Sequence, residues 1–423
     1  MVRRDTEDRC ACGVGPERRR WLAPLWAVVW ATSAPAWAET PPVEAPPVEA
    51  RRVSWVAIPN FGYDVDDGLG LGARGEIDWY DEGYDPYQLA LVIHAYASTN
   101  GFHHHRVRFD APGLGPAHNL RLTGHFAYRQ WLNDGYWGMG NGTVLDRAAY
   151  DALPDEPLYK RYRYTLMQPF GRLTLRGELG GPWAWFGFLA GRYSHIEQYD
   201  GALLGEDQPL GLEGGFGVQP GVGLLFDTRE PELTPDRGVL VELSARGMPR
   251  LPGAEAEWVA GFASVRAFAK LGPKLVLAGR VMGEAMFGDV PFYDLNTWGG
   301  LVPTMGVGGS DSVRGVNFGR WRDTHKVAVN SELRIDVGTH TVLSRELRWQ
   351  IVPFADAVTV WGEEPLGDWP VHPGFGLGVH PIVADTFVGR LDVAVGVDRV
   401  RELDGTLTPV PSLGVYLVFD HMM

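Results

Sequence analysis

The chain has 423 residues, with 55 glycines, 16 tryptophans and a formal net charge of −14. This length suits two or three soluble domains or one large barrel, and the acidic balance makes nucleic acid a poor partner. Past residue 38 no apolar stretch is long enough for a transmembrane helix, which excludes a helical membrane protein. Abundant glycine and tryptophan are instead typical of membrane β-barrels.

The N-terminal segment has the organisation of a secretory signal peptide. A run of arginines precedes a short apolar stretch, Trp21–Trp30, and Ala36–Ala38 supplies a small-x-small cleavage site. We therefore expect residues 1–38 to be removed on export. Both cysteines, Cys10 and Cys12, lie in this segment, so the mature chain is expected to have no disulfide, thiol nucleophile or zinc–thiolate site.

A duplicated PPVEA sequence makes residues 39–52 a short proline-rich linker. Strand patterns follow from residue 53, with about sixteen segments that alternate apolar and polar residues. In Val327–Asp336 one face carries valine, leucine and isoleucine, and the other carries asparagine, glutamate, arginine and aspartate. We predict an all-β fold for 53–423, a single antiparallel transmembrane barrel of about sixteen strands with apolar residues toward lipid.

The connections between the predicted strands alternate in length. Short turns are expected at 112–117 and 271–273. Long loops are expected at 131–159, 198–212, 287–324 and 399–411. Segregation of long loops to one end is typical of outer-membrane barrels, whereas a secreted β-solenoid or double sandwich, the alternatives, has no reason for it. One strand, 182–197, is apolar on both faces, which predicts that something covers its inner side.

The two ends of the predicted barrel have distinctive strands. The last strand ends in alternating residues that include Gly414 and Phe419, the kind of terminal signal that barrel-assembly machinery recognises. Pro59 in the first strand and Pro411 at the entrance of the last lack a backbone N–H. We therefore expect the seam between the first and last strands to be the weakest pairing in the barrel.

Three motifs resemble those of the BamA/TamA superfamily of outer-membrane assembly and translocation barrels, also described as bacterial surface antigen barrels. The first is the loop Gly308–Gly315, similar to the family's GG…VRG loop and placed between the eleventh and twelfth strands. The second is the aromatic-x-Asp motif Phe354–Asp356. The third is a turn motif made of Asp227, Thr228, Arg229, Pro235 and Gly238. The resemblance extends over residues 53–421.

This resemblance implies a barrel in the Gram-negative outer membrane that assists insertion or translocation of protein or lipid. Family members usually carry periplasmic repeats, the POTRA domains, before the barrel, but only the short linker precedes residue 53 here. A separate periplasmic accessory protein would then supply that module. A passive porin or structural barrel with a plugged lumen is the alternative. The expected partners are outer-membrane lipid and a client, and the barrel is expected to be a monomer without a cofactor.

The resemblance and the strand phase together single out Arg314 and Gly315 in the loop. Asp356 shares a strand face with Gln350 and so is expected to point into the lumen, where Arg314 could meet it. Glu332, Arg334 and Arg348 are expected to form the surrounding lumen network. A solvated arginine on a surface loop is the alternative interpretation.

No enzyme or metal chemistry is expected from the remaining motifs. The run His103–His105 would place only two imidazoles on one side of a strand, so we interpret it as a loop-tip histidine run rather than a metal site. No G-x-S-x-G sequence accompanies the missing thiol, so the chain is not expected to be a hydrolase.

Overall fold

The structure is a computed structural model, described here for residues 51–419 except 65–67, 83, 85–86, 116–118, 153–155, 232–233, 253, 255, 343–344, 363–365, 367–369 and 384–386. The expected signal peptide and most of the linker lie outside the described residues. Arg51 and Arg52, assigned to the linker from the sequence, already belong to the first strand, because they pair with the end of the second.

Strands make up nearly the whole fold, and β6 (Leu145–Asp146) is the only very short one among the described residues. The sixteen long strands are β1 (Arg51–Asp64), β2 (Gly68–Asp81), β3 (Leu89–Ser98), β4 (Phe102–Leu114), β5 (Leu120–Gly135), β7 (Arg163–Gly180), β8 (Trp183–Gln198), β9 (Gly215–Asp227), β10 (Gly238–Met248), β11 (Trp258–Gly272), β12 (Leu275–Gly288), β13 (His325–Val342), β14 (Arg345–Trp361), β15 (His372–Val383), β16 (Phe387–Arg401) and β17 (Leu407–Phe419). The predicted all-β fold with about sixteen strands is confirmed.

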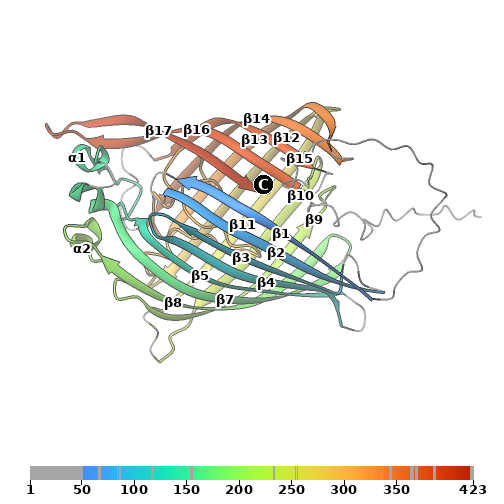
Figure 1. Cartoon of the computed structure of the whole chain (residues 1–423). Helices are drawn as coiled ribbons and strands as arrows, with labels where there is room; N and C mark the ends of the chain where they lie inside the picture. Colours follow the sequence, from blue (N-terminus) through green and yellow to red (C-terminus); the bar gives the residue numbers. More distant parts are fainter. Residues whose placement is uncertain are drawn as a thin grey trace, which may run out of the picture.

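Each long strand pairs antiparallel with the next, from β1 through to β17, and the sheet curls into a barrel (Figure 1). Among the described residues no backbone pairing joins β17 to β1, so the ladder is not closed at this seam. Pro411 lies within β17 opposite Val397, and not at the strand's entrance as expected, because β17 begins at Leu407.

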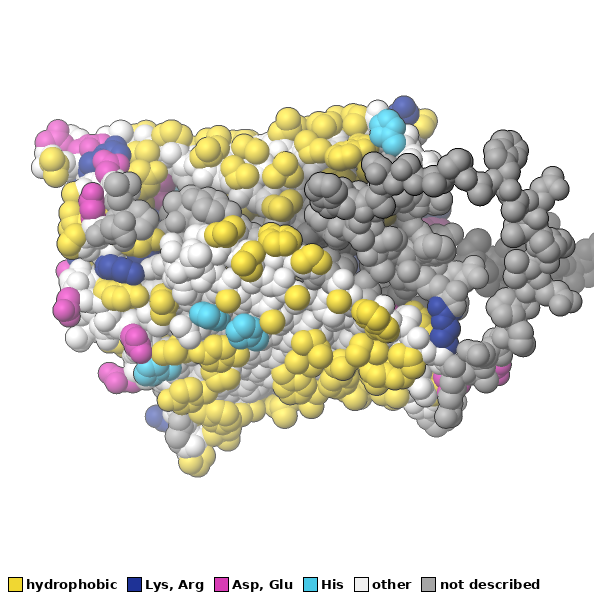
Figure 2. All heavy atoms as spheres, viewed as in Figure 1, with side chains coloured by type: hydrophobic (Ala, Val, Ile, Leu, Met, Phe, Trp, Pro, Cys, Tyr) yellow, Lys and Arg dark blue, Asp and Glu magenta, His cyan; other side chains and the backbone are white. Residues whose placement is uncertain are grey.

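Apolar side chains cover the outer face of the sheet. Val222, Val265 and Val281 are 63%, 43% and 49% exposed in the middle of their strands, which is costly in water and favourable in lipid. On the face turned toward the viewer, Figure 2 shows hydrophobic side chains across the middle of the molecule, with most of the visible acidic side chains at one end. The described residues contain no helix that is long and apolar enough to span a membrane.

The long connections gather at one end of the barrel, called here the long-loop end. They are 136–162, which contains β6, α1 (Arg147–Tyr150) and the 3-10 helix η2 (Pro157–Tyr162); 199–214, which contains α2 (Leu203–Asp207); and 289–324. The opposite end has short turns such as 181–182 and 273–274. The expected long loop at 399–411 is wrong, because β16 and β17 extend outward as a hairpin and leave only the turn 402–406.

The connection 289–324, called here the plug loop, folds back inside the barrel. Its Leu301 packs against the buried Phe186 and Phe188 of β8, and its Gly300 carbonyl accepts a hydrogen bond of 2.8 Å from Arg172. The strand that is apolar on both faces is therefore covered on its inner side by this loop, as predicted.

Candidate functional site

The plug loop builds its own apolar core inside a polar lumen. Val307, Val313, Val316 and Trp321 are fully or almost fully buried, and they pack against inward residues of β11 to β14 such as Met282. Turns within the loop satisfy part of its backbone, for example the Gly309 N–H to the Val313 carbonyl at 3.0 Å. This packing fixes the Gly308–Gly315 motif against the barrel wall.

Arg314 lies at the centre of the packed region, with its side chain completely buried. Its Nε and Nη2 donate to the two carboxylate oxygens of Asp356 at 2.8 and 3.1 Å, and its backbone N–H donates to Asp356 at 3.1 Å. Its Nη1 reaches Glu332 and Asp392, both at 3.0 Å. The guanidinium also stacks on Phe354, 3.4 Å from the ring centre. One loop cation thus joins carboxylates of β13, β14 and β16.

Gly315 allows the loop backbone to approach the last strands. Its φ is +94°, and a Cβ there would collide with the backbone of Val395 and Gly396 on β16. Its N–H donates to the Tyr416 hydroxyl on β17 at 2.9 Å, and that hydroxyl in turn lies 3.4 Å from the Val316 carbonyl. The motif therefore contacts both strands of the hairpin that borders the open seam.

Further polar groups hold the three carboxylates in place. Asp392 accepts from His380 at 2.9 Å and lies 3.3 Å from Arg390. Asn330 donates to Asp356 at 2.9 Å. Sequence reasoning missed Asp392, His380 and Tyr416. The polar phase of Asp392 within its strand was visible, but only the barrel's curvature brings β16 and β17 to the loop.

Of the supporting residues expected around Arg314, two lie there and one does not. Arg334 donates to Glu332 at 3.0 Å, and both side chains are buried. Arg348 forms a separate, partly exposed pair with Asp336 at 3.4 Å. Arg348 is eight residues from Asp356 along β14, which puts them on the order of 26 Å apart at ~3.3 Å per residue. Its assignment to the network is wrong for that reason.

A second anchor ties the plug loop to the long-loop end. Arg320 donates to Asp398 of β16 at 2.6 and 2.8 Å and to Thr143 of the connection 136–162 at 2.8 Å. That connection also adds β6 in parallel to the end of β16, Leu145 opposite Val400. The plug, the opposite wall and the seam hairpin are thereby joined at this end of the barrel.

The turn motif between β9 and β10 is a compact structural unit. Arg229 donates to both oxygens of Asp227 at 2.9 and 2.7 Å, and Thr228 Oγ1 accepts the N–H of Val239 at 3.0 Å. Gly238 has a φ of +97°, and a Cβ there would collide with the Thr228 carbonyl. Pro235 is buried in the same turn. These contacts stabilise the turn itself.

The residues expected to form a C-terminal signal lie on β17, which ends at Phe419. A Cβ on Gly414 would collide with the Tyr416 ring, so glycine there lets the tyrosine lie across the strand and reach the plug loop. Recognition of this strand by assembly machinery remains a prediction.

The histidine run does not lie at a loop tip, as interpreted from the sequence, because β4 begins at Phe102 and includes all three residues. The rings of His103 and His105 are 5.9 Å apart on one side of the strand, and His104 lies 6.2 Å from His94 on the other. Within the described part of the chain, no group of three histidine, cysteine or acidic side chains is arranged to hold a metal ion.

Comparisons with known proteins identify the fold. No protein-family model and no curated protein sequence matches the chain. Among solved structures, BamA from Haemophilus ducreyi lacking POTRA domains 1-3 is similar, with a TM-score of 0.53 and 13% identity over 86% of this chain and 70% of that one. CdiB from Escherichia coli gives a TM-score of 0.56 and 13% identity over 92% of this chain.

The chain spans 63% of the length of CdiB. At 13% identity these likenesses show the fold, which is that of the barrels of BamA and CdiB. The motif-based resemblance thus agrees with the structural one in architecture.

Proposed function

We propose that this chain is an outer-membrane barrel that assists insertion or translocation of a protein or lipid through the seam between β1 and β17. The observation that carries the proposal is the unpaired seam in a barrel whose plug loop is locked against the wall by the Arg314 ion pairs. The plug loop contacts the β16–β17 hairpin through Gly315 and Tyr416, so the plug and one edge of the seam are mechanically connected. BamA and CdiB share this architecture. The proposal assigns no catalytic reaction and no cofactor.

The seam is suited to opening because few groups would have to be separated. In lipid a strand edge cannot exchange its backbone hydrogen bonds for water, so a closed ladder is expensive to part. Between β1 and β17 no such ladder is present among the described residues. Exposed apolar residues on both edges, such as Trp55 and Leu413, would face lipid next to an incoming chain.

A disulfide clasp across the seam tests the proposal. Pairs of cysteines, one in Val53–Phe61 of β1 and one in Leu413–Leu417 of β17, can be introduced into a mature chain that has no cysteine. We expect the oxidised clasp to slow the folding of a urea-denatured eight-stranded barrel into proteoliposomes, and reduction to restore the rate.

The matched control is the pair Val281→Cys and Val329→Cys, which are opposite each other on the outer face of the closed β12–β13 ladder. This clasp should leave the rate unchanged. An equal rate for the clasped and reduced seam would contradict lateral opening and favour the passive, plugged barrel. In that passive barrel, the buried Arg314 cluster would serve only to hold the plug loop in place.

Placement in the outer membrane, with the long-loop end at the cell surface, has its own test. Asp151 in connection 136–162 and Glu230 in the β9–β10 turn are both exposed, at opposite ends of the barrel. In intact cells Asp151→Cys should react with a membrane-impermeant maleimide, and Glu230→Cys should react only after lysis. Labelling of position 230 alone would invert the orientation.

A further inference from the structure

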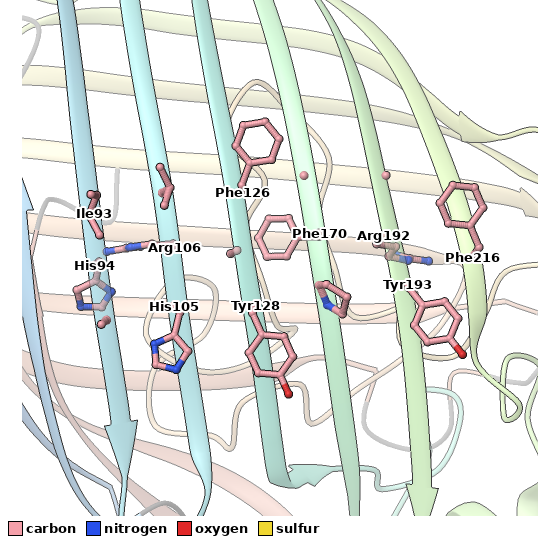
Figure 3. Close-up of a pocket in the computed structure, with 16 residues that line it drawn as sticks. Ile93, His94, His105, Arg106, Phe126, Tyr128, Phe170, Arg192, Tyr193 and Phe216 are labelled. Carbon is pink, nitrogen blue, oxygen red and sulfur yellow. The ribbon is translucent and has the colours of Figure 1, made fainter.

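The inner face of β3 to β7 carries a group of basic side chains, called here the cationic wall: His94, His104, Arg106, Arg108, His125, Arg129 and Arg172. These residues alternate along their strands with outward, exposed ones such as Ile93, Val107 and Phe126. Figure 3 shows this part of the sheet, with Phe126 and Tyr128 on one side of β5. The cationic wall therefore faces the lumen.

Strand register sets these groups directly beside one another. Arg108 is opposite His125, which is opposite Arg172; His94 is opposite Arg106; and His104 is opposite Arg129. Successive inward rows on a strand are roughly 7 Å apart. Basic groups directly opposite each other on a sheet destabilise it when charged. A chain with a net charge of −14 nonetheless concentrates them here.

The carboxylates nearest the cationic wall on the inner face are Glu76 and Asp78 of β2 and Asp110 of β4, and Glu76 is paired with Arg74 at 3.1 Å. No carboxylate of the described residues lies within salt-bridge distance of Arg108, Arg129 or Arg172. Arg129 instead donates to Gln168 and Arg172 to the Gly300 carbonyl, at 3.1 and 2.8 Å. The nearby Asp110 is already engaged by Arg121 at 2.7 Å.

The buried polar atoms of the cationic wall that have no hydrogen-bond partner among the described residues include Nε of Arg129, Nε2 of His125 and Nδ1 of His94. Buried polar groups normally find one. Arg108, on the same inner face, is exposed to the lumen. Exposed charge, missing counter-ions and unsatisfied donors together indicate a site that is completed by an anion.

We propose that the cationic wall binds the phosphate groups of an anionic ligand inside the lumen. Guanidinium groups present paired donors that match phosphate oxygens, and phosphate can accept from several such groups at once. Rows about 7 Å apart suit a diphosphate or a phosphate on a larger body. The phosphate can come from a soluble compound or from a lipid headgroup. This inference goes beyond the insertion role and does not depend on it.

Calorimetric titration of the full mature barrel in neutral detergent, with pyrophosphate as the probe, tests the proposal. We expect Arg108→Gln to weaken binding at least tenfold and Arg108→Lys to retain part of it. Arg108 makes no hydrogen bond or ion pair with the described residues, so both variants should fold, which heat-modifiable mobility verifies.

The matched control is Arg237→Gln, the same charge change on an exposed residue of the β9–β10 turn, and it should bind like the parent. A second arm compares phosphatidic acid with diacylglycerol of the same acyl chains in mixed micelles. Retention of phosphatidic acid by the parent but not by Arg108→Gln would make a lipid the source, and binding of pyrophosphate alone would make it a soluble compound. Absence of binding to both probes, or equal binding by Arg108→Gln, would overturn the proposal. Neither of these two outcomes would affect the insertion proposal, which the disulfide clasp across the seam tests separately.

Discussion

The two halves of the lumen wall handle charge in opposite ways. On β13 to β16 buried cations pair with carboxylates of the chain itself, as Arg314 pairs with Asp356, Glu332 and Asp392. On β3 to β7 the cations of the cationic wall lie beside one another, and Arg108 has no ion pair with the described residues. The first arrangement pairs its charges within the chain, whereas the second leaves Arg108 without an ion pair among the described residues, and we propose that an anion binds there.

This difference separates charges that stabilise the fold from charges that could bind a ligand. Removing one partner of a buried, paired cluster leaves uncompensated charge in a poorly solvated place, which is expensive. Removing one member of a group of like charges instead lowers the electrostatic repulsion and does not destabilise the fold. The same chemical change, arginine to a neutral residue, should therefore have opposite effects on the two halves.

The largest effect is expected at the plug. Arg314→Ala leaves three buried carboxylates without their shared cation, and the free energy of unfolding should fall by about 3–5 kcal/mol. Guanidinium unfolding of the refolded barrel, followed by tryptophan fluorescence, measures this change.

Arg348→Ala is the matched control for Arg314→Ala. Its pair with Asp336 is partly exposed, so it should cost no more than about 1 kcal/mol. Equal losses for the two variants would mean that the Arg314 cluster is not a lock.

A smaller effect is expected where the plug meets the last strand. Tyr416→Phe removes the hydroxyl that accepts the Gly315 N–H, and stability should fall by about 0.5–1.5 kcal/mol. Hydrogen exchange at Gly315 and Val316 should speed up while exchange in β13 stays the same. Unaltered exchange at both residues would show that the hydroxyl does not hold the loop.

On the cationic wall, replacing an arginine is expected not to lower the free energy of unfolding. Arg108→Gln removes a positive charge from a row that also holds His125 and, one strand further, Arg172, so without added phosphate the free energy of unfolding should stay unchanged or rise by up to about 1 kcal/mol. The same guanidinium unfolding measures it. A loss comparable to that of Arg314→Ala would remove the distinction between the two halves.

The smallest effect is expected where the connection 136–162 links the two halves at the long-loop end. Arg147 donates to Glu402 in the β16–β17 turn at 2.7 Å, and this hydrogen bond lowers the pKa of Glu402 below its ordinary value of 4.5. A carboxylate with a lowered pKa stabilises the folded state above 4.5, and that contribution is lost as the pH falls through the folded pKa.

Limited proteolysis near Arg147 should therefore accelerate below pH 4.5 in the parent. Glu402→Gln should be cut at a rate that no longer changes over that range. An identical pH response in both proteins would assign it to other groups.

The sequence predicted the wall of the barrel better than its interior. Alternation fixed the strand positions because a period of two exposes every second residue to lipid, and β13 and β14 lie where the pattern put them. The loop at 399–411 was misjudged because a hairpin that extends beyond the membrane needs no apolar face. Arg348 was misplaced because alternation gives the side of a strand and not the depth along it.

Arg314 and Asp356 were singled out by family resemblance and strand phase, and the structure places them together. The sequence by itself determined the sixteen alternating strands, the position of the plug loop and the inward phase of its acidic partner, since these follow from local periodicity and motifs. Only the tertiary structure decided that Asp392 and Tyr416 reach the plug, that no backbone pairing joins β17 to β1 among the described residues, and that basic residues of four strands form one surface. Curvature and register bring together residues far apart in the chain, and no local pattern encodes that proximity.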